Sequence, residues 1–141
     1  VAIDYNPNSD HVYVVQHGRD QLHQFFPEHY TLEEGVELPA EEFFMLSDGA
    51  DFGWPYCYYD QLKQKKVLAP EYGGDGDKVG RCAEKDDPVF AFPGHIAPND
   101  IHFYRGTQFP DRFRHGAFIA FHGSWNRSPL LYLCHMAMEY K

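Results

Sequence analysis

The sequence predicts an all-β fold, and three observations support this prediction. Short runs rich in Val, Ile, Phe and Tyr recur along the chain, and 12 glycines with 10 prolines supply the turns that many short strands need. Hydrophobic residues make up 43% of the 141 positions and aromatic residues 17%, which is enough for a packed core. No helical repeat stands out, and no apolar run reaches the length of about 18 residues that a membrane span requires.

Three of the expected strands end in a polar loop that contains a histidine and a glycine. The strand-and-loop pairs are 12–15 with 16–20 (QHGRD), 89–92 with 93–100 (PGHIAPND) and 117–121 with 122–127 (HGSWNR). An apolar strand that ends in convergent polar groups is how a scaffold delivers side chains to a ligand pocket. The alternative for the last loop is a glycine turn with Trp125 as a lid over the core. Three repeats of one layout favour a radial array of similar units.

Two stretches between the first two of these units have a different character. Residues 21–26 are compatible with a helix that could extend to His29, and Pro27 interrupts it. Residues 48–57 (DGADFGWPYC) combine turn residues with aromatic residues on either side. We therefore expect one short helix and one turn-rich loop in this part of the chain.

Four blocks of the sequence resemble the glucose/sorbosone dehydrogenase family. These are soluble quinoproteins that bind pyrroloquinoline quinone (PQQ) on a six-bladed β-propeller. The matching blocks, in the family's order, are 16–20 (QHGRD), 51–55 (DFGWP), 94–100 (GHIAPND) and 121–127 (FHGSWNR). The pattern is closer to the sorbosone dehydrogenase branch than to the glucose branch. The resemblance implies a PQQ-dependent oxidoreductase that oxidises sugars or aldoses, with PQQ and Ca²⁺ as cofactors.

The length of the chain predicts a partial domain. A propeller blade takes about 40 to 50 residues in four strands, so 141 residues hold about three blades of a six-bladed ring. We expect residues 1–129 to form this partial β-propeller, with a blade strand entered midway at Val1, and residues 130–141 to be a divergent tail. The remaining blades of the propeller would then be partners of the chain, and open strand edges would favour oligomers.

The cysteines predict a disulfide. Cys57 and Cys82 flank the Gly-rich stretch 71–77, which would be a long and poorly anchored loop without a covalent link. Closing a loop of that size stabilises a fold by about 3 kcal/mol. A disulfide implies an oxidising compartment, so together with the resemblance it favours a periplasmic or secreted protein. The alternative is two free buried thiols, and Cys134 has no obvious partner.

The resemblance assigns the first loop to calcium and to the cofactor. In the family, this loop gives backbone carbonyl oxygens to a calcium ion, and the residue before the glycine faces the quinone. By position, Gly18 and Arg19 would supply the carbonyls and His17 would face PQQ. Calcium accepts carbonyl oxygen readily, so the change from the proline of the glucose branch to Arg19 leaves backbone ligation intact. The alternative is a glycine turn with a solvated histidine and arginine.

The other two loops supply the remaining cofactor contacts that the resemblance implies. Pro93 and Pro98 stiffen the second loop, so it can hold His95 in a set orientation near the quinone. PQQ carries three carboxylates, and a planar guanidinium pairs with a carboxylate in bidentate fashion. We therefore expect Arg127 to bind the cofactor and Trp125 to cover its ring face.

No catalytic residue is assigned within these positions. In the family, a histidine from an earlier blade takes the proton from the sugar hydroxyl, and that histidine and an Arg-Asn pair belong upstream of Val1. We therefore expect this chain to be inactive without the rest of the ring. The alternative of a different class is a non-catalytic propeller fragment with a binding or packing role only.

Composition and spacing argue against several other functions. The 12 Lys and Arg against 21 Asp and Glu give a net charge of −9, which repels nucleic acid and favours a neutral substrate. The chain has no HxH, HExxH or CxxC motif, so a zinc site would need ligands from distant loops. Residues 75–77 (DGD) lack the closing glutamate of an EF-hand loop. The Gly123-Ser124 step lacks the second glycine of a nucleophile elbow, which argues against a serine hydrolase.

Overall fold

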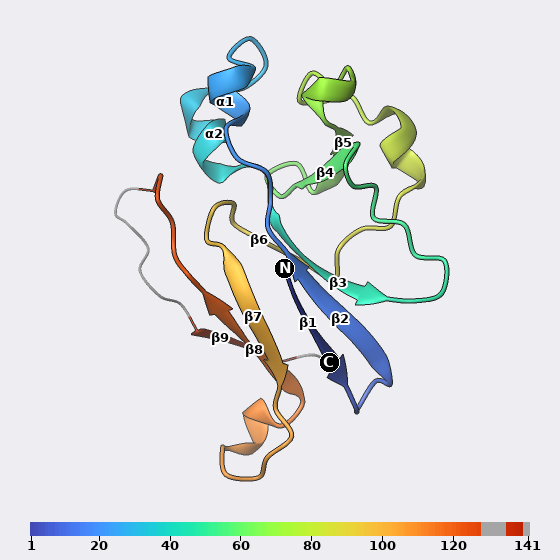
Figure 1. Cartoon of the computed structure of the whole chain (residues 1–141), viewed down its shortest axis with the longest axis vertical. Helices are drawn as coiled ribbons and strands as arrows, with labels where there is room; N and C mark the ends of the chain where they lie inside the picture. The colour runs from blue at the N-terminus through green and yellow to red at the C-terminus, as the bar shows by residue number, and fades with distance from the viewer. Residues whose placement is uncertain (128–134, 140–141) are drawn as a thin grey trace.

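The computed structural model describes residues 1–127 and the backbone of residues 135–139. In this part of the chain, short antiparallel strands form three sheets, and the helices are few and short (Figure 1). The all-β prediction is confirmed. Within the same residues, no helix is both long and apolar enough to cross a membrane.

The first sheet contains four antiparallel strands in the order β1-β2-β3-β6. They are β1 (Ala2–Asn6), β2 (His11–Gln16), β3 (Glu41–Leu46) and β6 (Phe90–Phe92). Tyr13 and Val15 of β2 are buried while Val12 and Val14 are half-buried, which is the alternation of a strand with one face on a core. This sheet has the four strands expected of a propeller blade.

The second large sheet has the order β7-β8-β9. It consists of β7 (Pro98–Phe103), β8 (Gly116–Phe121) and β9 (His135–Glu139). A bulge between Pro98 and Asp100 shifts the pairing of β7 with β8 by one residue. The backbone of β9 falls within the expected tail 130–141 and pairs with β8, whereas residues 128–134 and 140–141 lie outside the described residues.

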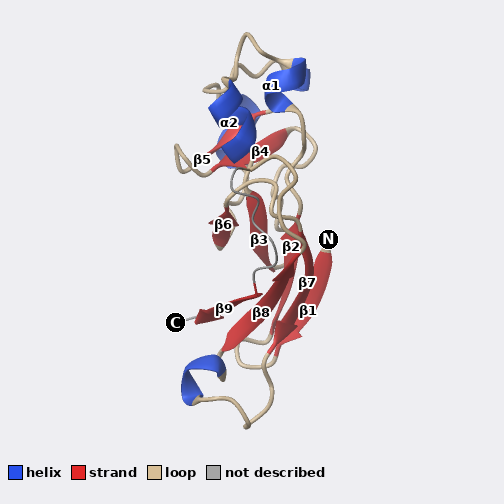
Figure 2. Ribbon diagram, turned by 90° about the vertical axis from the view of Figure 1, so that its left-hand side faces the viewer, coloured by secondary structure: helices blue, strands red, loops and turns tan. Residues whose placement is uncertain are grey.

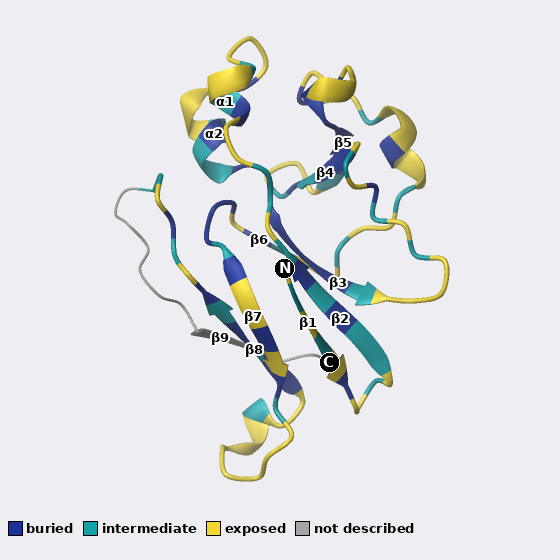
Figure 3. Ribbon diagram, in the orientation of Figure 1, coloured by how far each residue is buried: buried dark blue, intermediate teal, exposed yellow. Residues whose placement is uncertain are grey.

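The main hydrophobic core lies between these two sheets, which pack face to face. Phe92 of β6 meets Phe121 of β8 with ring centroids 5.0 Å apart, and Tyr13 of β2 meets Phe103 of β7 at 4.9 Å. Figure 3 shows these buried positions alternating with half-buried or exposed ones along β2 and β7. The first strands of the two sheets lie side by side, and the backbone N–H of Phe103 donates to Asp4 at 2.7 Å (Figures 1 and 2).

Two insertions lie at one end of the first sheet (Figure 2). Between β2 and β3 are α1 (Leu22–Phe25) and α2 (Leu32–Glu37). From the sequence, α1 was predicted but α2 was not. Between β3 and β6 are the hairpin β4 (Cys57–Asp60) with β5 (Lys65–Leu68) and the 3-10 helices η1 (Pro70–Tyr72) and η2 (Gly80–Glu84). A third 3-10 helix, η3 (Asp111–Phe113), lies in the β7–β8 connection at the opposite end (Figure 1).

A second core joins the two insertions to each other. It contains the buried side chains Leu22, Tyr30, Leu38, Tyr58, Val67 and Ala69. The hydroxyl groups of Tyr30 and Tyr58 are 2.8 Å apart within it. Burial, together with the hydrogen bond to Tyr30, raises the pKa of Tyr58 far above its usual value. Both phenols are therefore neutral, and the hydrogen bond fixes the helices against the hairpin.

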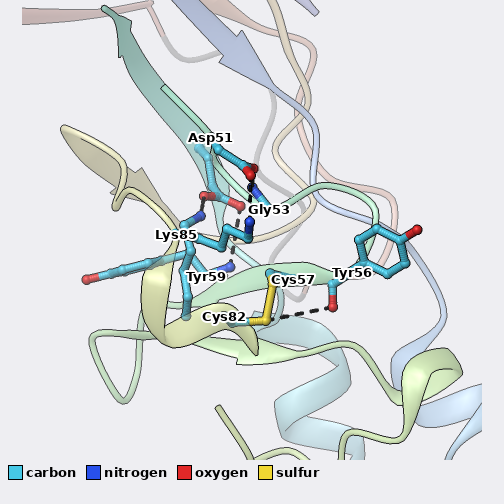
Figure 4. Close-up of a disulfide and its surroundings, with 9 residues drawn as sticks. Asp51, Gly53, Tyr56, Cys57, Tyr59, Cys82 and Lys85 are labelled. Atoms are coloured by element: carbon cyan, nitrogen blue, oxygen red, sulfur yellow. Dashed lines mark hydrogen bonds and ion pairs between the residues drawn. A yellow bond between two sulfur atoms is a disulfide. The ribbon is translucent and has the colours of Figure 1, made fainter. Parts of the chain in front are cut away.

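The predicted disulfide between Cys57 and Cys82 is confirmed (Figure 4). It links the start of β4 to η2, so it closes the stretch that contains the Gly-rich residues 71–77. Gly53 packs directly on this link, because a Cβ there would lie 2.9 Å from the Cys57 Sγ. We call residues 50–86, which the disulfide holds together, the stapled lobe.

About three blades were expected, and the described residues form three sheets of unequal size. The β4–β5 hairpin is inserted between the third and fourth strands of the first sheet and does not form a blade of its own. The insertions carry residues that a plain propeller blade would not need.

Candidate functional site

The three predicted loops converge on one pocket of about 250 Å³. The loop after β2, the loop between β6 and β7, and the loop after β8 each contribute side chains to it. The lining residues are His17, Gly18, Asp20, Glu41, His95, Ala97, His122, Gly123, Ser124 and Trp125. The pocket therefore unites four of the predicted site residues, His17, Gly18, His95 and Trp125.

Glu41, the first residue of β3, connects the first two loops from beneath. Its Oε2 accepts the backbone N–H of Gly18 at 2.7 Å, and its Oε1 accepts the backbone N–H of Ala97 at 3.2 Å. The side chain is buried, and burial raises the pKa of the Glu41 carboxyl, although the two N–H donors lower it in part. Because both oxygens are already used, Glu41 positions the loops.

Gly18 allows the first loop to pass very close to the chain that enters β3. A Cβ at this position would lie 2.9 Å from the carbonyl oxygens of both Pro39 and Ala40. Only glycine fits such an approach without displacing backbone. The neighbouring His17 is more exposed, and its Nε2 donates to the Pro98 carbonyl at 2.9 Å. The first loop is thereby tied to the second at its outer side as well.

His95 is buried and fully engaged in hydrogen bonds. Its Nδ1 lies 2.8 Å from an Asp20 carboxylate oxygen, and its Nε2 lies 2.9 Å from the Leu38 carbonyl and 3.1 Å from the Gly35 carbonyl. The backbone of His95 has a φ of 62°, a left-handed conformation that few side chains adopt. The expected fixed orientation of His95 is present, and its ring edge meets Trp125 at a centroid distance of 6.2 Å.

The loop after β8 closes the third side of the pocket. The backbone N–H groups of His122 and Gly123 donate to the carbonyls of Ala97 and Ile96, at 2.9 and 3.1 Å. These bonds hold the third loop against the second. Trp125 follows with 60% of its surface exposed. An indole on an anchored loop with most of its surface exposed is available to a ligand.

Arg127 lies beside the pocket and is not among its lining residues. Its two terminal nitrogens each donate to a Glu37 carboxylate oxygen at 2.8 Å, and its Nε donates to the Gly94 carbonyl at 3.0 Å. Only 13% of the arginine side chain is exposed. The guanidinium therefore holds α2 to the second loop in this structure, and its pairing with a cofactor carboxylate stays a prediction.

Arg19 points toward the stapled lobe. Its guanidinium pairs with Glu71 and lies 5.7 Å from the centre of the Phe26 ring. Arg19 also lines a second pocket of about 280 Å³, and His17 and Gly18 line both pockets. Within residues 1–127, no cluster of three or more His, Cys, Asp or Glu side chains could hold a metal ion. Calcium ligation by the backbone carbonyls of Gly18 and Arg19 stays a prediction.

Six of the lining residues were not assigned from the sequence, and these are Asp20, Glu41, Ala97, His122, Gly123 and Ser124. Asp20 and His122 lie within the predicted loops, so their position beside His17 and Trp125 was a usable signal. Glu41 lies in a strand that begins with two glutamates, and nothing in the local pattern distinguishes the one that faces the loops. Ser124 is held by its neighbour, since its Oγ donates to the Asn126 side chain at 2.9 Å.

Residues 1–131 match the model of one protein family, TrAA12-like. An uncharacterized protein of Borreliella burgdorferi is 31% identical over 129 residues, which are 91% of this chain and 29% of that protein.

Two solved structures also share the fold. They are a calcium structure of Trichoderma reesei Carbohydrate-Active Enzymes Family AA12, with a TM-score of 0.66 and 21% identity, and the holo form of the pyranose dehydrogenase PQQ domain from Coprinopsis cinerea, with a TM-score of 0.60 and 23% identity. The match to the Trichoderma reesei structure covers 98% of this chain and 36% of that chain. The match to the Coprinopsis cinerea structure covers 94% of this chain and 34% of that chain. The chain thus has the fold of part of a β-propeller, and it spans about a third of the length of these proteins.

Proposed function

Because this chain belongs to the TrAA12-like family, we propose that it is part of a PQQ-dependent oxidoreductase that oxidises sugars or aldoses. One observation carries the proposal: three loops from different parts of the sequence build a single pocket, with an exposed indole at its rim and oxygen groups within it. The sorbosone-like substrate class and the need for the remaining blades belong to the same proposal. The chain carries part of the cofactor and calcium site.

The residues present fit these two cofactors by their chemistry. When bound, PQQ supplies a quinone that accepts a hydride from the sugar. Trp125 offers a flat face for its rings, and the rings of His17 and His95 line the pocket beside it. The Asp20 carboxylate and the carbonyls of the first loop are hard oxygen ligands of the type that Ca²⁺ prefers.

In this proposal the chain's own groups position and shield the cofactor. Glu41 keeps the first two loops at a constant separation through its two backbone hydrogen bonds. His95 is fixed by Asp20 and by backbone carbonyls, so it presents one ring orientation to the pocket. A site held in this way needs little rearrangement when a ligand binds, which favours affinity.

A PQQ titration of the ring that contains this chain together with the remaining blades tests the proposal. We expect a saturable change in the PQQ absorbance in the presence of Ca²⁺, and loss of that change when EGTA removes the ion. Trp125→Ala should weaken binding by about tenfold, since it removes an aromatic contact. Gln108→Ala is the control, because Gln108 is exposed in the β7–β8 connection and is not among the residues that line the pocket. Binding that is independent of calcium, or unchanged in Trp125→Ala, would contradict this assignment.

A non-catalytic binding or packing role is the second candidate, and the engagement of Arg127 favours it. The Arg127 guanidinium, which lies beside the pocket, is already paired with the Glu37 carboxylate. A chain evolved only for packing would keep such a pair and would not bind PQQ. An absorbance titration of the completed ring that shows no spectral change at saturating calcium, on protein with cooperative thermal unfolding, would select this candidate.

A further inference from the structure

A cleft of about 370 Å³ lies next to the pocket, between α1 and the stapled lobe. Its rim carries three exposed aromatic side chains, Phe25 from α1 and Trp54 and Tyr72 from the stapled lobe. Asp20 lines both this cleft and the first pocket, so the two cavities adjoin. We call this cavity the Trp54 cleft.

The Trp54 side chain extends into solvent from a loop that is anchored at several points. Its side chain is 74% exposed, more than any other aromatic residue among those described. Asp51 accepts the N–H of Gly53 at 2.9 Å and pairs with Lys85 at 2.5 Å, and the disulfide of Cys57 anchors the end of the loop (Figure 4). An exposed indole on a loop that is anchored in this way is available to stack on a ligand.

The polar groups of the cleft fit a neutral ligand rich in hydroxyl groups. Asp20 and Gln21 present planar oxygen and nitrogen groups, and the Arg19–Glu71 pair spans from the first loop to the stapled lobe. Two carboxylates against one guanidinium disfavour an anion. Planar carboxylate, amide and guanidinium groups can each bond two neighbouring hydroxyls, while an aromatic face packs on the C–H face of a pyranose ring.

We propose that the Trp54 cleft binds a second sugar ring, so that the chain takes a neutral oligosaccharide and not a single monosaccharide. One ring stacks on Trp54, and the chain of sugars continues past Asp20 into the first pocket. This inference rests on the proposed function for the identity of the first pocket. The cleft itself binds its ring through Trp54, whether or not PQQ is present.

Tryptophan fluorescence of the 141-residue chain tests this site, because the sequence has two tryptophans. In a Trp125→Phe protein all tryptophan emission comes from Trp54, and we expect maltotriose or cellotriose to shift it saturably. Glucose should bind about tenfold more weakly, because it can occupy one subsite only. Unchanged Trp54 emission at saturating trisaccharide, or glucose binding as tight as trisaccharide binding, would overturn the proposal.

Variants of Trp54, assayed by calorimetry, separate stacking from a structural effect. Trp54→Ala should lose at least about tenfold in trisaccharide affinity, and Trp54→Phe should retain most of it. Neither should change the thermal midpoint, because the indole is exposed. If Trp54→Ala leaves the trisaccharide affinity unchanged, the cleft assignment is wrong. It is also wrong if the parent protein binds no saccharide and Trp54→Ala abolishes self-association instead. Calcium-dependent PQQ binding, measured separately, shows whether the proposed function stands independently of this result.

Discussion

Glu37 and Arg127 lie 90 residues apart in the sequence and form a bidentate ion pair, with both nitrogen-to-oxygen distances at 2.8 Å. The pair joins the end of α2 to the segment that follows β8. Together with the bond from Arg127 to the Gly94 carbonyl, it connects the loops around the pocket from outside. The Arg127 guanidinium can pair either with Glu37 or with a cofactor carboxylate, and substitutions distinguish the two roles.

Arg127→Ala should lower the free energy of unfolding by about 1.5 kcal/mol. This is the low end for charge-assisted hydrogen bonds, because Glu37 is partly exposed. If Arg127 also binds PQQ, the variant should lose roughly ten- to hundredfold in affinity, and Glu37→Gln should strengthen binding by freeing the guanidinium. Urea unfolding and the PQQ titration measure both effects. Unaltered affinity in both variants would restrict Arg127 to the ion pair.

Glu41 should make stability depend on pH in a defined direction. Burial raises the pKa of its carboxyl from the ordinary value of 4.5, so the folded state holds a proton that the unfolded state releases. The contribution of Glu41 to stability is therefore largest below pH 4.5 and declines as the pH rises through its folded-state pKa. Subtracting the Glu41→Gln curve from the wild-type curve, in urea unfolding between about pH 4 and pH 8, should show this decline. Parallel curves would mean that the carboxyl titrates normally.

The disulfide should resist alkylation and contribute to stability. Without reduction, one of the three cysteines should react with iodoacetamide, and all three should react after reduction. The Cys57→Ser, Cys82→Ser protein should be about 3 kcal/mol less stable, with Cys134→Ser as the control background. Intact mass and urea unfolding are the measurements. Three labels on protein refolded under oxidising conditions would contradict the bond. Its formation in the native host would support a periplasmic or secreted location.

Gly18→Ala should destabilise the first loop. The added methyl group would lie 2.9 Å from two backbone carbonyl oxygens, so the chain at residues 39–40 must move. We expect a loss of about 1 to 3 kcal/mol and weaker PQQ binding, measured by thermal unfolding and absorbance. Asn99→Ala, at an exposed position of β7, serves as the control. Equal stability of the two variants would show that the loop relaxes easily.

The isolated chain should associate with itself. The first sheet leaves apolar side chains in water, including Ile3 at 63% exposure and Phe90 at 45%. Such surface favours association, as do the open edges of the sheets. Sedimentation velocity at micromolar concentration should show oligomers that dissociate on dilution. A single monomer peak with sharp thermal unfolding would count against this expectation.

Much of the fold and part of the site followed from local sequence. Residues 12–15 and 117–121 were predicted as strands because they are short runs of mainly β-branched and aromatic residues, and the polar loops that follow them line one pocket. α2 was missed because it is short and contains Gly35, although Thr31 and Glu34 form the capping box that marks its start. The partner of Arg127 could not be read locally, because pairing across 90 residues depends on the tertiary fold.

The two separate cores have an evolutionary consequence. One core holds the blades to each other, and the other, built from Leu22, Tyr58 and their neighbours, holds the inserted helices to the hairpin. Substitutions in the second core can reshape the rim of the cavities while the blade-to-blade packing remains intact. Lineages that share this scaffold can therefore diverge in what they recognise by changing the insertions alone, and comparison of their insertions should show faster change there than along β2 and β8.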